Sequence, residues 1–210
     1  MSDSHSTARL EAFCDGVFAI AITLLVIDIK IPATAEVHDT AGLWHALHHI
    51  LPSIFAFVLS FGVILITWIN HHNHLKLVHK TSNSFLYANG FLLLTVAFIP
   101  FPTSLLGEYL LTDYASPAVI LYNGVLSLQA LGWVILSRTA LSANLGKSEK
   151  ATRDIRNAGN FGYFASGLYA LCALLAIWFP LGIALFTTLT WLFWLVYGLK
   201  IKHEETIPSM

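Results

Sequence analysis

The stretch RLEAFCDGVFAIAITLLVIDIKIP, residues 9–32, joins charged residues to a long apolar run. The segment from Val17 to Ile27 carries no charge, but it has only 11 residues. A helix of that length spans about 16 Å, whereas the hydrocarbon core of a bilayer is about 30 Å thick. If this helix crosses a membrane, it must therefore continue back through Asp15 to about Arg9.

The composition of the chain is that of an integral membrane protein. Hydrophobic residues make up 56% of the 210 residues and charged residues only 11%, whereas soluble domains carry roughly 25% charged residues. The net charge of −1 says nothing about nucleic acid, but no segment resembles a basic binding arm, so no nucleic-acid partner is expected. Cys14 and Cys172 both lie in apolar segments, which favours small buried side chains over a disulfide framework or a metal site.

A signal peptide is the alternative interpretation of the N-terminal segment. Residues 17–27 have the length of a signal-peptide core, and the ATA at 33–35 resembles a cleavage site. However, Glu11 and Asp15 occupy the region that is positively charged in signal peptides, and Lys30 interrupts the approach to the site. We therefore expect the segment to remain in the mature protein.

Six segments have the roughly 20 mostly apolar residues that a membrane-spanning helix needs. They are residues 9–30, 48–70, 85–106, 116–138, 159–179 and 181–200. The FIPFP at 98–102 predicts a bend or stop in the third span. The longest polar connection, 139–158, is expected to be a linker between the fourth and fifth spans. Residues 1–210 are thus predicted to form a single all-α domain of six transmembrane helices.

The basic residues predict the orientation of the chain. Ten of the eleven lysines and arginines lie at the start of the first span, between the second and third, at or beyond the end of the fourth, or at the end of the sixth, and only Lys30 falls on the other side. Cytoplasmic loops are enriched in lysine and arginine. Both termini and the linker 139–158 are therefore expected in the cytoplasm, in a multi-pass protein of the cell membrane.

Helical geometry sorts the first span into faces. One face carries Gly16, Ile20, Thr23, Leu24, Ile27 and Ile31, whereas Asp15 lies on another face with Ile22 and Val26. Because a buried charge in hydrocarbon costs several kcal/mol unless it finds a partner or water, we expect this helix at the centre of the bundle, shielded by the other five. Ordinary helix packing is the alternative interpretation of the apolar stripe.

The sequence RLEAFCD, from Arg9 through Phe13 and Cys14 to Asp15, resembles the Arg-x-x-x-Phe-Ser-Asp signature of the transmembrane protein 175 family of potassium channels. The chain is identified on this basis as a prokaryotic member. It departs from the signature at Cys14, where the family usually has serine. A thiol is a weaker hydrogen-bond partner than a hydroxyl.

The resemblance implies a homotetramer in a lipid bilayer, with four six-helix units around a pore lined by the first helix. It assigns Ile20, Leu24 and Ile27 to hydrophobic constrictions, and Thr23 to a layer that helps to select potassium over sodium. A ring of apolar side chains closes a pore by excluding water. The Thr-Val-Gly-Tyr-Gly filter of ordinary potassium channels is absent from the chain.

Polar residues of the second and third spans are candidates for fixing the first. Trp68 and His72 are four residues apart and share a helix face, and Asn89 lies at a similar depth. Buried polar groups need partners. We therefore expect one network of Arg9, Asp15, Trp68, His72 and Asn89, with the role of holding the pore helix.

The expected function is a potassium-selective leak channel without a cofactor. No span carries the ladder of arginines that a voltage sensor needs, so the channel is expected to be voltage-insensitive. A proton-conducting channel is the alternative, because Asp15 and the histidines form a possible proton relay. A secondary transporter would show a broken helix or an internal repeat, and an enzyme would need a nucleophile or carboxylate cluster. The histidines at 45–49 and 71–79 lack a cysteine or carboxylate that would complete a metal site.

Overall fold

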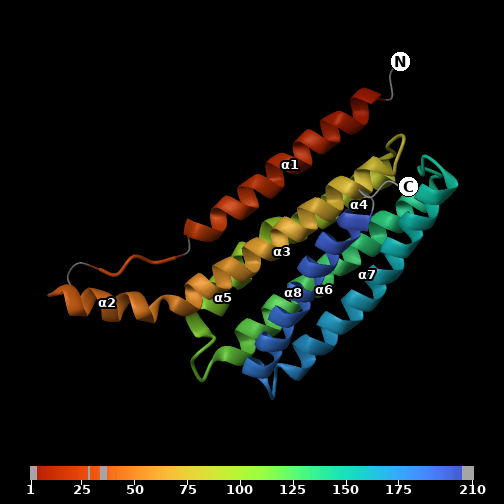
Figure 1. The fold of residues 1–210 in the computed structure, drawn as a ribbon. Helices are drawn as coiled ribbons and strands as arrows, with labels where there is room; N and C mark the ends of the chain where they lie inside the picture. Colours follow the sequence, from red (N-terminus) through yellow and green to blue (C-terminus); the bar gives the residue numbers. More distant parts are fainter. Residues whose placement is uncertain (1–3, 28, 34–36, 205–210) are drawn as a thin grey trace.

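The computed structural model describes residues 4–27, 29–33 and 37–204, and this part of the chain folds into helices without a sheet (Figure 1). The helices are α1 (Ser4–Ile27), α2 (Thr40–His49), α3 (Leu51–Lys76), α4 (Asn83–Phe98), α5 (Pro100–Tyr109), α6 (Ala115–Ser142), α7 (Glu149–Leu175) and α8 (Pro180–Glu204). The predicted all-α class is confirmed. Side chains are described only for residues 7–192 within these ranges.

Five helical segments are long and apolar enough to cross a membrane. They are Thr7–Ile27, Leu51–Lys76, Asn83–Tyr109, Ala115–Ser142 and Glu149–Leu175. They correspond to the first five predicted spans, so the chain is a multi-pass membrane protein. The sixth predicted span, 181–200, falls in α8, whose described apolar part, Pro180–Leu192, is shorter. The sixth span therefore stays a prediction.

Proline divides the third span into two helices. The helix α4 ends at Phe98, and α5 begins at Pro100, with Ile99 between them. Proline has no N–H group and its ring clashes with the preceding turn, so the hydrogen-bond ladder cannot continue unbroken. The break that the FIPFP sequence predicts is present.

The connection between α6 and α7 is shorter than predicted. Only residues 143–148 of the predicted linker 139–158 are non-helical. The side chain of Ser148 accepts a hydrogen bond from the backbone N–H of Ala151 and so caps α7. Because this cap lies at Ser148, α7 begins at Glu149, ahead of the apolar segment 159–179. The polar residues 149–158 therefore form the first turns of α7. The placement of the linker in the cytoplasm stays a prediction.

The helix α2 is not among the predicted segments. It begins after Asp39, whose side chain accepts a hydrogen bond from the backbone N–H of Gly42. None of its residues is buried, and it extends away from the bundle at the end where α3 begins (Figure 1).

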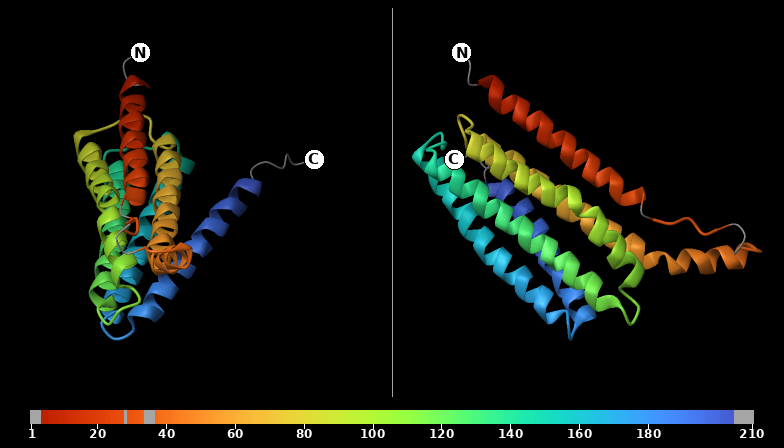
Figure 2. Two further views of the ribbon diagram at one scale, coloured as in Figure 1. Left: turned by 90° about the vertical axis from the view of Figure 1, so that its left-hand side faces the viewer. Right: turned by 180° about the vertical axis from the view of Figure 1, so that it is seen from behind.

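The remaining helices form an elongated bundle whose successive long helices run antiparallel (Figures 1 and 2). The tightest pair is α6 with α7, and α4 packs on the other side of α6. The helix α1 lies along one side of this bundle, against α3, α4 and α5 (Figure 2). The last helix, α8, contacts α3, α6 and α7.

Small residues allow α6 and α7 to approach closely. The Ser127 hydroxyl donates to the Ser166 carbonyl at 2.9 Å, and the Ser166 hydroxyl donates to the Ser127 carbonyl at 3.1 Å. Further along the pair, Gly162 faces Val134 and the Ala130 carbonyl. Membrane helices associate through such small-residue contacts because apolar side chains gain little by leaving lipid.

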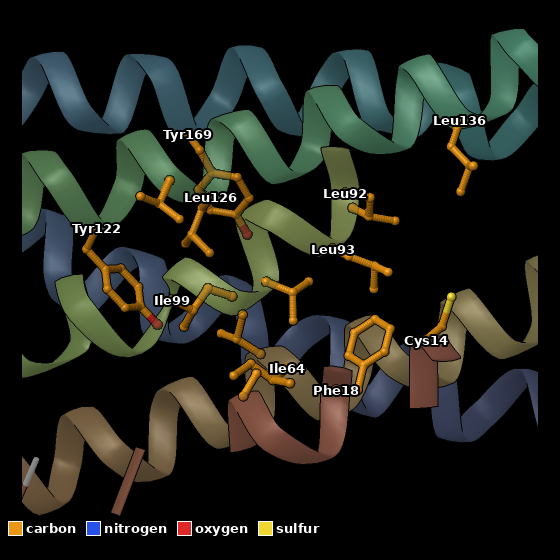
Figure 3. Close-up of a cluster of buried hydrophobic side chains, with 14 of the residues drawn as sticks. Cys14, Phe18, Ile64, Leu92, Leu93, Ile99, Tyr122, Leu126, Leu136 and Tyr169 are labelled. Carbon is orange, nitrogen blue, oxygen red and sulfur yellow. The ribbon is translucent and has the colours of Figure 1, made fainter. Parts of the chain in front are cut away.

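One continuous apolar cluster fills the centre of the bundle (Figure 3). Cys14 and Phe18 of α1 belong to it together with Ile64 of α3 and Leu93 of α4. A buried polar contact lies beside the cluster, where the Ser60 hydroxyl is 3.0 Å from the Tyr122 hydroxyl. The cluster therefore attaches α1 to the helices behind it.

Replacing Gly162 with alanine should destabilise the α6–α7 pair. A Cβ at this position would lie 2.9 Å from Val134 Cγ2 and 3.1 Å from the Ala130 carbonyl oxygen, so the helices would have to separate. We expect a loss of about 1–3 kcal/mol, as for other overpacked sites, measured as a lower melting temperature of the purified protein. Gly167→Ala in the same helix is the control, since nothing lies within 4 Å of its Cβ position. Equal melting temperatures for the two variants would contradict the packing argument.

Candidate functional site: the first helix and its polar contacts

One face of α1 is built to pack against its own chain. Its buried residues recur every three or four positions, which is the spacing of a single helix face. They are Leu10, Cys14, Phe18, Ala21 and Leu25. The C-terminal half of the helix is held by apolar contacts of this face, and the N-terminal half also has polar contacts.

The opposite face of α1 is open. Ile20 is 61% exposed, Leu24 41% and Ile27 72%, and Thr23 is exposed between them. The expectation that the other five helices shield α1 is therefore wrong for the single chain. The reason is that α1 buries one face only, and the acidic side chains of Asp15 and Glu11 find partners without enclosure of the whole helix. Val26, predicted on the face of Asp15, is also exposed.

Thr23 satisfies its donor within its own helix. Its hydroxyl donates to the Ile20 carbonyl at 2.9 Å. A hydroxyl oxygen retains two lone pairs when its hydrogen is engaged. Thr23 thus places an oxygen acceptor on an otherwise apolar exposed face.

Asp15 and Glu11 connect α1 to α3. The indole Nε1 of Trp68 donates to Asp15 Oδ1 at 2.8 Å. One turn away, His72 Nδ1 lies 2.7 Å from Glu11 Oε1, and the His72 ring stacks on Trp68. Residues four apart on each helix therefore form two adjacent contacts, which fix the rotation of α1 relative to α3.

A second set of polar contacts is fully buried and connects α1, α4 and α3. The side-chain amide of Asn89 donates from Nδ2 to Cys14 Sγ at 3.1 Å. Its Oδ1 lies 2.6 Å from His71 Nε2, which must be the donor because an amide oxygen only accepts. The thiol of Cys14 thus occupies the acceptor position that a serine hydroxyl would take.

The predicted single network is divided into these two sets. Asn89 contacts His71, whereas His72 contacts Glu11, so His72 and Asn89 fall into different sets. Arg9 is exposed and, among the described residues, forms no ion pair; Phe13 is also exposed. His71 and Glu11 are the residues that sequence reasoning missed. Adjacent histidines differ by about 100° around a helix, and sequence spacing does not show which of them faces the neighbouring helix.

The histidines do not gather around a metal position in the described part of the chain, where no group of three or more metal-ligating side chains occurs. His45 and His49 contact each other edge to face on α2, with ring centroids 4.5 Å apart. His74 packs against Trp133. The rings of His45, His49 and His74 therefore contact other rings.

An apolar bundle of long helices, with a first helix that is anchored by one face and open along the other, defines a multi-pass helical membrane protein. Comparison with known proteins identifies its kind. Residues 9–100 match the model of the family described as the endosomal/lysosomal potassium channel TMEM175. A relative from Chamaesiphon minutus, named a potassium channel, is 40% identical over 185 residues, which cover 86% of this chain and 91% of that protein. The chain belongs to the TMEM175 family, which is a family of ion channels and not of enzymes.

Two further comparisons bear on the fold and on the range of the family. The crystal structure of a TMEM175 homologue from Chamaesiphon minutus, described as a lysosomal potassium-selective channel homologue, matches with a TM-score of 0.78 and 36% identity, covering 91% of this chain and 97% of that chain. A chicken protein named the endosomal/lysosomal proton channel TMEM175 is 32% identical over 114 residues, which cover 52% of this chain and 23% of that protein.

Replacing Asp15 with alanine should weaken the attachment of α1 to α3. The variant leaves the Trp68 indole N–H in a half-buried position without its acceptor, and an unsatisfied donor costs about 1–3 kcal/mol. We expect a lower melting temperature and less assembled protein on size exclusion. Asp15→Asn is the control, because its amide oxygen still accepts from Trp68. If Asp15→Ala assembles normally but alters the preference for potassium over sodium, then Asp15 acts in the pore and the anchoring role is wrong.

Proposed function

We propose that this protein is a potassium-selective leak channel, in which four copies enclose a pore lined by α1. The observation that carries the proposal is the open apolar face of a helix that is otherwise firmly attached. Ile20, Leu24 and Ile27 are exposed in one chain, on the same stripe as the exposed Thr23 hydroxyl. The names of the relatives as potassium channels, reported above, support the choice of ion.

Cyclic symmetry would turn this face into a series of rings. A side chain that points at a symmetry axis meets its own copies, so each of Ile20, Leu24 and Ile27 would form one apolar ring. With a rise of about 1.5 Å per residue, the rings extend over about 10 Å of the pore. Water leaves such a constriction readily, which blocks ions without a plug.

Selection for potassium would depend on Thr23. An apolar ring offers no ligand to replace the water around an ion, whereas the Thr23 oxygen lies on the same exposed face and is free to accept. Four copies would place four hydroxyl oxygens between the Ile20 ring and the Leu24 ring, with the Ile27 ring beyond Leu24. Thr23 is therefore the proposed selectivity residue.

Topology completes the proposal. We place α8 across the membrane as the sixth span, which puts both termini and the α6–α7 connection in the cytoplasm of a cell-membrane protein. The distribution of lysine and arginine supports this orientation. Because no span carries a ladder of arginines, the channel is proposed to be insensitive to voltage.

Proton conduction is the second candidate function. It is favoured by the half-exposed contact between the Glu11 carboxylate and the His72 imidazole, and by the name of the animal relative. Reversal potentials in opposed potassium and pH gradients separate the two functions. A reversal potential that follows the pH gradient would replace potassium by the proton as the permeant ion.

The protein should be a homotetramer, because one exposed stripe per chain cannot enclose a pore. Native mass spectrometry of the purified protein should give the mass of four chains. A monomer that conducts potassium in a defined bilayer would rule out the shared pore.

Replacing Ile20 with asparagine should raise the current severalfold. Asparagine has a similar size but holds water in the ring, which lowers the barrier that an apolar constriction presents to ions. Selectivity should loosen as well, since more hydrated ions gain a wet path. Thr23→Ala should instead lower the preference for potassium with less effect on closure. Both variants are compared with the wild type by single-channel recording in potassium and in sodium.

A matched control for this comparison is Leu171→Asn, which makes the same change at an exposed position of α7, on the side of the bundle away from α1 (Figure 2). It should leave conductance and selectivity unchanged. If Ile20→Asn behaves like Leu171→Asn, the stripe on α1 is ordinary packing surface.

A further inference from the structure

The two ends of α1 are held in different ways. Its N-terminal half has the buried contact of Cys14 with Asn89 and the contacts of Asp15 and Glu11 with α3. Beyond its C-terminal residue Ile27, the chain is joined to α5 by an ion pair, in which Lys30 Nζ lies 2.8 Å from Glu108 Oε2. This pair connects residues that are 78 positions apart in the sequence.

The ion pair borders a cavity of about 230 Å³ between the ends of α1, α3 and α5. Leu25 lines it from α1, and Ser53 and Ser104 line it from α3 and α5. Since one water occupies about 30 Å³ in the liquid, the cavity has room for several. The cavity therefore lies beside the last turn of α1 and has hydroxyl groups in its wall. The ion pair of Lys30 and Glu108 lies at its edge.

Glu108 and Lys30 differ in how firmly the chain around them is packed. Glu108 follows Gly107, at which a Cβ would lie 2.8 Å from the Cα of Ser53, so α5 and α3 are in close backbone contact at this level. Lys30 lies outside α1, and its side chain is 76% exposed, against 50% for Glu108. If the pair is broken, the segment that moves is therefore the end of α1 and not α5.

We propose that Lys30 and Glu108 are positioning residues that hold the C-terminal end of α1 against its own bundle and keep the Ile27 ring open. This inference rests on the proposed pore. Ile27 and Ile31 are both strongly exposed. Removing their apolar surface from water is favourable, so in a shared pore they would be drawn towards the axis and their symmetry copies. Lys30 is three residues from Ile27, so a tether at Lys30 opposes that movement directly.

Lys30 keeps its charge under ordinary conditions. The hydrogen bond that Lys30 donates to Glu108, together with the negative charge of that carboxylate, raises the pKa of Lys30 above the ordinary lysine value. A raised lysine pKa means that Lys30 is charged below that value and loses its charge as the pH rises through it. Experiments at neutral pH therefore compare the charged pair with its variants.

The test is a charge exchange. Lys30→Glu and Glu108→Lys each place like charges together and should lower single-channel potassium conductance at least twofold. The double variant, Lys30→Glu with Glu108→Lys, restores an opposite pair and should recover most of the wild-type conductance. Asp113→Lys is the control for charge alone, because it makes the same change as Glu108→Lys in the exposed α5–α6 connection.

A second measurement does not depend on conduction. Amide hydrogen exchange of residues 24–31 should become faster in both single variants and return towards the wild-type rate in the double variant. The positioning role of Lys30 and Glu108 is wrong if the single variants exchange like the wild type or if a single variant conducts better than the wild type. It is also wrong if the loss of conductance in the double variant is the sum of the losses in the two single variants. If the wild-type protein passes no potassium, the proposed function fails, and the exchange rates still decide whether the pair holds α1.

Discussion

Attachment of α1 along one face is the constraint on which the rest of this structure depends. Phe18, Ala21 and Leu25 pack into the bundle, and the residues on the other side of the same turns remain exposed. A helix attached on all sides would have no surface left for a pore, and a helix without a buried face would not be held in a membrane, where apolar side chains gain little by packing. Every functional role proposed for α1 therefore requires that one of its faces is buried and the other exposed.

The polar contacts explain how a membrane-spanning helix carries acidic side chains at all. Asp15 and Glu11 each reach a partner on α3, and Asn89 joins the buried thiol of Cys14 to His71. In hydrocarbon, such groups are tolerated when they are paired or reach water. These contacts also fix the depth and rotation of α1 in the bundle. The polar side chains near the N-terminus of α1 therefore determine which way the apolar stripe on the same helix faces.

The stability of α1 is expected to fall from its N-terminal half to its C-terminal end. Buried hydrogen bonds resist opening, whereas an exposed ion pair is screened by water and salt. The cavity beside Lys30 and Glu108 lies next to Leu25 in the last turn of α1, and beyond Ile27 the exposed ion pair joins the chain to α5. A channel built in this way would be rigid where the helix is anchored and adjustable where Ile27 lies.

Local properties of the chain were sufficient for much of this description. The lengths of the apolar segments predicted five helices that the structure shows, the helical period separated Ile20 and Leu24 from Asp15, and proline marked the break at Ile99. These features depend on residues within a few turns of each other, so they can be read without knowing what lies beside them. The short motif around Asp15 carried the family resemblance for the same reason.

Contacts between distant segments were decided by packing. Which histidine meets Asn89, how α1 lies on the side of the bundle, and the pairing of Lys30 with Glu108 all depend on how helices rotate and approach one another. A difference of one residue turns a side chain by about 100°, so a small rotation changes the partner while the hydropathy pattern stays the same. The sequence therefore determined the helices and their faces, and the three-dimensional packing determined which faces meet.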